Sequence, residues 1–65
     1  MSYIIKWIPK DQDLTIDHTR RYEDLAEAIT VARNLLQLQP KKIWIEDEKG
    51  ELHGDDGLIR HRDHG

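Results

Sequence analysis

Residues 23–38, which read EDLAEAITVARNLLQL, decide how this chain folds. Their apolar side chains recur at the i, i+3, i+4 and i+7 spacing that lines one face of an α-helix. These apolar residues are Leu25, Ala28, Ile29, Ala32, Leu35 and Leu36. Two acids at the start complement the positive end of the helix dipole, and Pro40 prevents continuation past Leu38. The stretch predicts one amphipathic helix, about 24 Å long at 1.5 Å per residue.

Two segments of alternating polarity precede this helix. Residues 3–8 are rich in β-branched and aromatic side chains, and residues 14–19 alternate Leu and Ile with Thr and Asp. The polar segment between them begins at Pro9 and contains two aspartates, which is typical of a connection. We therefore predict two strands that pair as a hairpin.

Two further strands are predicted after the helix. Residues 42–46 alternate again, and residues 51–53 begin a short returning strand. Gly50 stands where a short hairpin loop requires a left-handed residue. We expect residues 54–57 to interrupt the last strand, after which Leu58 and Ile59 add a final contact.

The fold class predicted from this order is α+β, a small and mostly antiparallel β-sheet with one helix packed on one face, in the order ββαββ. Residues 1–59 form a single domain in this prediction, and residues 60–65 are expected to be a flexible tail. If the helix returns the chain beside the first strand, all neighbours are antiparallel. A return beside the second strand creates one parallel pair, and the sequence does not choose.

Composition excludes several classes of protein. The chain has 65 residues and no cysteine, which excludes a disulfide scaffold, a cysteine-ligated zinc finger and a thiol enzyme. Lys and Arg total 10 against 13 Asp and Glu, a net charge of −3 that weighs against a nucleic-acid partner. No segment resembles a signal peptide or approaches the roughly 20 apolar residues that span a bilayer. We expect a cytoplasmic protein without a membrane partner.

Catalytic motifs are missing from the sequence. Ser2 is the only serine, and no glycine spacing matches a phosphate-binding loop. The neighbours Asp17 and His18 point to opposite faces of a strand, so they do not meet in one site. A calcium loop starting at Asp11 would need Gly and Glu where Ile16 and Tyr22 stand. We predict that the protein is not an enzyme.

Imidazole and carboxylate groups gather near the C-terminus, and these are the groups that zinc and nickel prefer. The candidate ligands are His53, Asp55, Asp56, His61 and His64. An acidic, glycine-rich segment is more commonly a solvated loop, and no helix is indicated that would bring the two last histidines together. We therefore predict no metal and no other cofactor, and these five residues remain the alternative.

Apolar surface is left over once one helix covers one face of the sheet. If Ile43 and Ile45 face the helix, Trp44 lies on the uncovered face. On the first strand, an outward Lys6 exposes Ile4 and Ile8, whereas an inward Lys6 exposes Tyr3, Ile5 and Trp7. The predicted interaction residues are Trp44, Ile4, Lys6 and Ile8.

An exposed Trp–Ile surface on an open sheet is typical of a partner site. We predict a non-enzymatic protein-interaction domain, a homodimer or a partner of another protein. In one alternative the stems of Lys6 and Lys42 shield the tryptophan. In another the aromatic face stacks single-stranded nucleic acid, aided by Arg20, Arg21, Lys41 and Lys42.

Two stretches carry a resemblance to known families. Residues 22–29, YEDLAEAI, and residues 43–52, IWIEDEKGEL, resemble the helix start and the strand–acid–Gly hairpin of small bacterial ββαββ families of unknown function. The resemblance covers about residues 3–53 and implies the architecture alone. The chain is more loosely similar to the antitoxin component of HicA/HicB toxin–antitoxin pairs, which implies an antitoxin-like binding protein.

Overall fold

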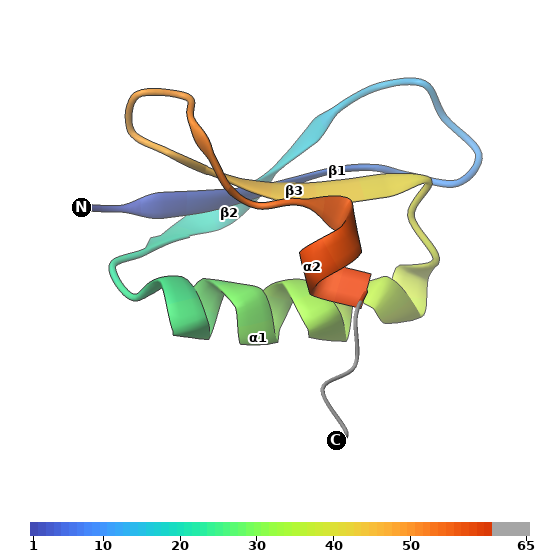
Figure 1. The fold of residues 1–65 in the computed structure, drawn as a ribbon. Coiled ribbons are helices and arrows are strands. Elements are labelled where there is room, and N and C mark those ends of the chain that lie inside the picture. The colour runs from blue at the N-terminus through green and yellow to red at the C-terminus, as the bar shows by residue number, and fades with distance from the viewer. Residues whose placement is uncertain (61–65) are drawn as a thin grey trace, which may run out of the picture.

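The computed structural model describes residues 1–60, which form a four-stranded sheet with helices against one of its faces (Figure 1). The elements in chain order are β1 (Tyr3–Ile8), β2 (Ile16–Tyr22), α1 (Leu25–Leu35), the 3-10 turn η1 (Leu36–Leu38), β3 (Lys42–Asp47), β4 (Leu52–Gly54) and α2 (Asp56–Arg60). The predicted α+β class and the ββαββ order are confirmed, and a second short helix follows the last strand. No helix within the described residues is long and apolar enough to cross a membrane.

The sheet has the strand order β2-β1-β3-β4, and every neighbouring pair is antiparallel. The helix thus returns the chain beside β1, the first of the two arrangements that the sequence left open. β1 and β3 pair along their whole length, with Ile5 opposite Ile45 at the centre. These central strands carry the core and fix which residues face outward.

The second strand begins later than predicted. Residues 14–19 were expected to pair, but β2 starts at Ile16, opposite Trp7, and ends at Tyr22, opposite Tyr3. A bulge lies within this pairing, and inside it the backbone N–H of Arg20 donates to His18 Nδ1 at 3.2 Å. The shifted register buries Tyr22, whereas Leu14 stays outside the sheet and 65% exposed.

The main helix is shorter than the predicted range 23–38. Asp24 is its N-cap, because the Asp24 side chain accepts the N–H of Ala26 at 3.0 Å, so the helix begins at Leu25. After Leu35 the chain tightens into the 3-10 turn. The turn ends at Gln39, whose φ of 55° is left-handed, and Pro40 follows. The apolar face of the helix nevertheless lies against the sheet as predicted.

The core lies between α1 and the sheet. Its largest fully buried side chains are Ile5, Ile43, Ile45 and Ile59. On α1 the fully buried residues are Ala28 and Ala32, whose small side chains let the helix approach the strands closely. Partly buried residues at the margin complete the cluster; they are Tyr3, Trp7, Leu25, Ile29, Val31, Leu35 and Leu36.

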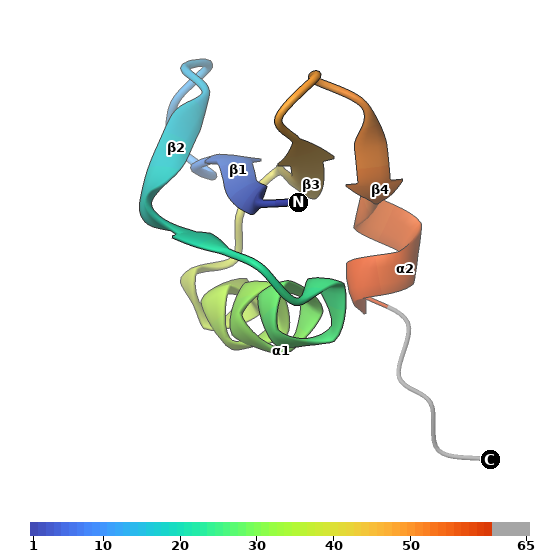
Figure 2. The ribbon, with the colours of Figure 1, turned by 90° about the vertical axis from the view of Figure 1, so that its left-hand side faces the viewer.

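The segment after β3 is more ordered than predicted. Gly50 has a φ of 84°, as the hairpin loop requires, but Gly54 belongs to β4 rather than to an interruption. Asp55 then accepts the N–H of Leu58 at 2.8 Å, and α2 folds back so that Ile59 is buried. Arg60 was assigned to the tail and is instead the last residue of α2. Figure 2 shows α2 continuing from β4 at the edge of the sheet, beside α1.

Candidate interaction surface

The face of the sheet opposite α1 is not covered by any helix or strand of residues 1–60 (Figures 1 and 2). We call this surface the open face. The pairing of the strands assigns to it the residues Asp17 and Arg21 of β2, Ile4, Lys6 and Ile8 of β1, Lys42, Trp44 and Glu46 of β3, and Leu52 of β4. All four interaction residues proposed from the sequence are among them.

Burial shows which side of each central strand faces the helix. Ile43 and Ile45 are buried against α1, so Trp44 between them lies on the open face. On β1, Ile5 is buried, which places Lys6 outward together with Ile4 and Ile8. The alternative in which Lys6 points inward is therefore wrong. The outward residues of these two strands are half-buried by one another, except Lys42, which is exposed.

Trp44 is held by polar contacts along its own strand. Its Nε1–H donates to Glu46 Oε2 at 2.7 Å, so the polar end of the ring is satisfied. The ammonium of Lys42 lies 5.8 Å from the ring centroid on the other side, a cation–π distance. Lys6, opposite Trp44 on β1, directs its ammonium to Glu46 at 3.2 Å and to Asp17 at 3.9 Å. Lys42 thus covers part of the ring, while Lys6 is occupied by carboxylates.

The charges of the open face are mixed rather than basic. Lys6, Lys42 and Arg21 are interspersed with Asp17 and Glu46. Arg20 and Arg21 lie on β2, whereas Lys42 begins β3 and Lys41 directly precedes it, so the two pairs lie on opposite sides of β1. Lys41 is paired with Asp13 at 2.7 Å, and the guanidinium of Arg20 lies 5.2 Å from the ring of Tyr22. The four cations do not form one patch, so this face lacks the continuous positive surface that nucleic-acid binding requires.

A hollow of about 350 Å³ adjoins Trp44 on the β4 side of the open face. Its lining includes Lys42, Trp44, Leu52, Asp55 and Asp56. Leu52 is 60% exposed where it lines this hollow. The hollow extends the apolar surface from the centre of the sheet to its β4 edge.

A second cluster of polar groups lies at the β3–β4 hairpin. Asp47 is buried, and its Oδ1 accepts the N–H groups of Lys49 at 2.8 Å and Glu51 at 3.0 Å. Its Oδ2 lies 2.6 Å from Nε2 of His53, whose ring meets the Tyr3 ring edge-on. The hydrogen bond from His53, with the two backbone donors, lowers the pKa of Asp47 against the opposing effect of burial.

The proposed metal ligands are not brought together within the described residues. His53 contacts Asp47 rather than an aspartate after β4. Asp55 caps α2, and Asp56 accepts the N–H of Ile43 at 2.9 Å and pairs with Arg60. The predictions for His61 and His64 lie outside the described residues.

Donor atoms of Asp47, Glu51 and His53 do lie within 4.8 Å of one another, a set that was not predicted from the sequence. The predicted hairpin could have indicated this cluster, because a loop between residues 47 and 52 places the end of β3 beside β4. Both oxygens of Asp47 already accept hydrogen bonds that shape the hairpin. The geometry therefore gives the cluster a structural role.

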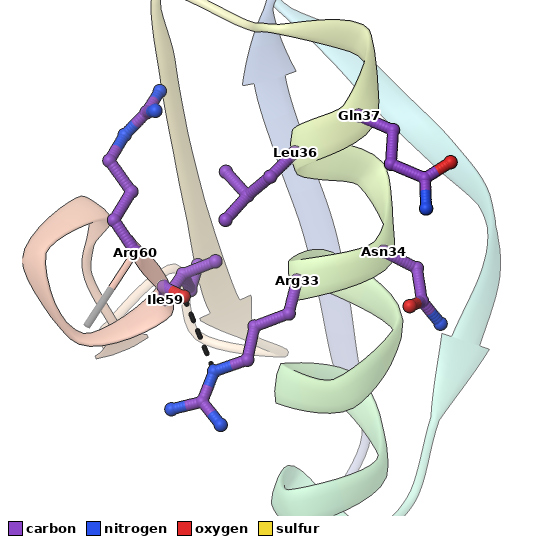
Figure 3. Close-up of a pocket in the computed structure, with 6 residues that line it drawn as sticks. All are labelled: Arg33, Asn34, Leu36, Gln37, Ile59 and Arg60. Carbon is purple, nitrogen blue, oxygen red and sulfur yellow. Dashed lines mark hydrogen bonds between the residues drawn. The ribbon is translucent and has the colours of Figure 1, made fainter. Parts of the chain in front are cut away.

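The hollow between α1 and α2 also has a structural explanation. It measures about 400 Å³ and is lined by Arg33, Asn34, Leu36, Gln37, Ile59 and Arg60 (Figure 3). Arg33 donates to the carbonyls of Ile59 at 3.2 Å and Leu58 at 3.4 Å, and Arg60 donates to the carbonyl of Pro40 at 2.6 Å. Figure 3 shows the two guanidinium groups at opposite ends of the hollow. These two side chains hold α2 against the rest of the fold, and their guanidinium groups do not converge on one point of the hollow.

Comparison with protein-family models, with curated proteins and with solved structures finds no match to this chain. The similarity to small bacterial ββαββ families stays a prediction, and so does the looser similarity to antitoxins.

Proposed function

We propose that this chain is a non-enzymatic protein-interaction domain that self-associates through the open face. The observation that carries the proposal is Trp44, which is half-buried on a sheet face that no helix or strand of residues 1–60 covers, beside Ile4, Ile8 and Leu52. Tryptophan is among the residues most enriched at interface centres, where it fills a large area with few rotatable bonds. A cytoplasmic location stays a prediction.

The size of the core supports a second copy as the missing layer. The fully buried large side chains all lie on the α1 side of the sheet, so the outward half of β1 and β3 contributes little to the monomer's core. A domain of about 60 residues buries only about 60% of the surface that its unfolded chain exposes. Covering the open face extends burial to the second side of the sheet, which makes self-association favourable.

Several polar groups of residues 1–60 that could serve general acid–base chemistry are engaged in structural contacts. Asp47 shapes the β3–β4 hairpin with His53, while Asp55 and Asp56 hold α2. Glu46 on the open face is bound by Lys6 and by the Trp44 ring. These contacts support a binding role rather than a catalytic one.

The Trp44→Glu variant tests the proposal. We expect it to weaken self-association by about thirtyfold or more, because the substitution removes the central aromatic contact and places a carboxylate in the interface. Sedimentation velocity over a range of concentrations measures the dimer, and circular dichroism checks that the fold is retained. Leu38→Glu is the matched control, since Leu38 is exposed on η1, away from the open face, and its replacement should leave the dimer unchanged.

A wild-type chain that remains monomeric up to about 1 mM would contradict self-association, since a dissociation constant above about 1 mM corresponds to less than about 4 kcal/mol of binding free energy. Equal loss in the Trp44→Glu and Leu38→Glu variants would also count against the open face. Quenching of the tryptophan fluorescence by single-stranded RNA, lost at high salt, would favour the nucleic-acid alternative instead.

A further inference from the structure

The outward row of β3 is self-complementary in charge. It reads Lys42, Trp44, Glu46, a cation and an anion at equal distances on either side of an aromatic ring. Consider a two-fold axis that runs parallel to the sheet, perpendicular to the strands, and passes over Trp44. This axis places a second copy on the open face with its β3 row running in the opposite direction. Lys42 then faces Glu46 of a second copy, Glu46 faces Lys42, and the two Trp44 rings meet at the axis.

The outward row of β1 is compatible with the same axis. It reads Ile4, Lys6, Ile8, so reversal places each isoleucine against an isoleucine of the second copy. Lys6 comes to lie near its own symmetry mate. This approach is tolerated because each Lys6 ammonium is matched within its own chain, by Glu46 at 3.2 Å and by Asp17 at 3.9 Å.

The groups that would form the new pairs are available. Within residues 1–60, Lys42 makes a cation–π contact with Trp44 and no ion pair. Glu46 uses Oε1 for Lys6 and Oε2 for Trp44 Nε1, and each carboxylate oxygen retains a second acceptor site. A Lys42 ammonium from a second copy therefore meets a carboxylate that is able to accept it.

The shape of the open face is also compatible with this two-fold axis. The β1–β2 and β3–β4 connections rise above it at opposite ends, one on the β2 side and one on the β4 side (Figures 1 and 2). The two-fold axis places each raised connection of one copy in an empty corner of the other. It also carries the exposed Leu52 toward the Lys42 end of the second copy, where the hollow beside Trp44 lies.

We infer that the occupant of the open face is a second copy of this chain, in an isologous dimer whose two-fold axis passes between the Trp44 rings and whose flanks are two reciprocal Lys42–Glu46 ion pairs. This inference rests on the proposed function and names its geometry. The two sheets pack face to face, with their strand directions within about 30° of each other, as in sheet sandwiches.

Charge exchange between two variants tests this symmetry. In the Lys42→Glu homodimer, two carboxylates face each other at each flank of the interface. In the Glu46→Lys homodimer, two ammonium groups face each other at each flank. We expect each variant alone to dimerise about tenfold or more weakly than the wild type. Mixed together they regain the opposite charges at both flanks, so native mass spectrometry of one isotope-labelled and one unlabelled variant should show mainly the heterodimer. The double variant Lys42→Glu/Glu46→Lys should regain the homodimer in part, because both flanks are again oppositely charged but only Asp17 is left to match Lys6.

The Glu46→Lys variant could misfold, because a lysine at position 46 cannot accept the Trp44 N–H. Glu46→Gln is the alternative variant, since its amide oxygen can still accept that N–H. If Glu46→Lys loses its native circular dichroism spectrum, Lys42→Glu mixed with Glu46→Gln should still form heterodimers more tightly than Lys42→Glu forms homodimers.

Three results decide the matter. Heterodimers that exceed both homodimers support the two-fold axis. A dimer that Trp44→Glu abolishes but that charge exchange does not restore overturns the axis and leaves the proposed function standing. A wild-type chain that is monomeric throughout overturns both.

Discussion

Replacing Ile45 by alanine is expected to lower the free energy of unfolding by roughly 3 kcal/mol, a large part of the stability of so small a domain. Ile45 is fully buried at the centre of the sheet, opposite Ile5 on β1 and Gly54 on β4. A Cβ built on Gly54 would lie only 3.1 Å from Ile45 Cδ1, so the strands already meet closely around this side chain and cannot collapse far into the space it leaves. Urea denaturation followed by circular dichroism measures the loss.

Ile8→Ala is the matched control for this prediction. Ile8 lies on the open face and is half-buried, so its truncation leaves no enclosed cavity in the monomer and should cost less than about 1 kcal/mol. Both variants are compared at a protein concentration at which the wild type is monomeric. A cost for Ile8→Ala as large as that for Ile45→Ala would contradict the placement of the core on the α1 side alone.

The elements that carry periodic patterns could be predicted from the sequence. Alternation in residues 42–46 indicated that Ile43 and Ile45 share one face of the strand and Trp44 the other, and the structure buries the two isoleucines. The helical spacing from Leu25 to Leu36 identified the face that packs on the sheet. These predictions succeed because a strand or helix with one apolar face has only one way to bury it.

Pairing between distant segments could not be predicted in the same way. The start of β2 is set by Trp7 opposite Ile16 and by a bulge, and neither follows from the alternation within residues 14–19. The side of the sheet to which Lys6 points likewise depended on which face of β1 the helix covers. Short elements that are stabilised by tertiary contacts cannot be predicted from the periodicity of the sequence.

The short helix α2 shows this most clearly. It spans only Asp56–Arg60 and forms because Ile59 is buried and because Arg33 and Arg60 bind backbone carbonyls of other segments. The contact between Asp47 and His53 is a second case, since it depends on the register of the β3–β4 hairpin. Candidate ligands chosen by their proximity in the sequence therefore missed Asp47, the carboxylate that His53 contacts.

That carboxylate makes the stability of the fold depend on pH at the acidic end. The hydrogen bond from His53, helped by the backbone N–H groups of Glu51 and Lys49, holds the pKa of Asp47 below the ordinary value of 3.8. A carboxyl whose pKa is lower in the folded state contributes stability that is complete above its unfolded pKa, about 3.9, and that is lost as the pH falls through the folded pKa. Thermal unfolding midpoints should therefore fall as the pH drops below about 4.

The Asp47→Asn variant isolates this contribution. The amide oxygen can still accept the N–H groups of Lys49 and Glu51, but the negative charge is gone, so the unfolding midpoint should drop by several degrees at neutral pH. The gap from the wild type should narrow below about pH 4, because the wild-type carboxyl then becomes neutral as well. Asp11→Asn is the control, since Asp11 is exposed in the connection between β1 and β2 and its side chain makes no hydrogen bond or ion pair within residues 1–60. If Asp47→Asn kept the full acid dependence of the wild type, another carboxyl would have to be responsible for it.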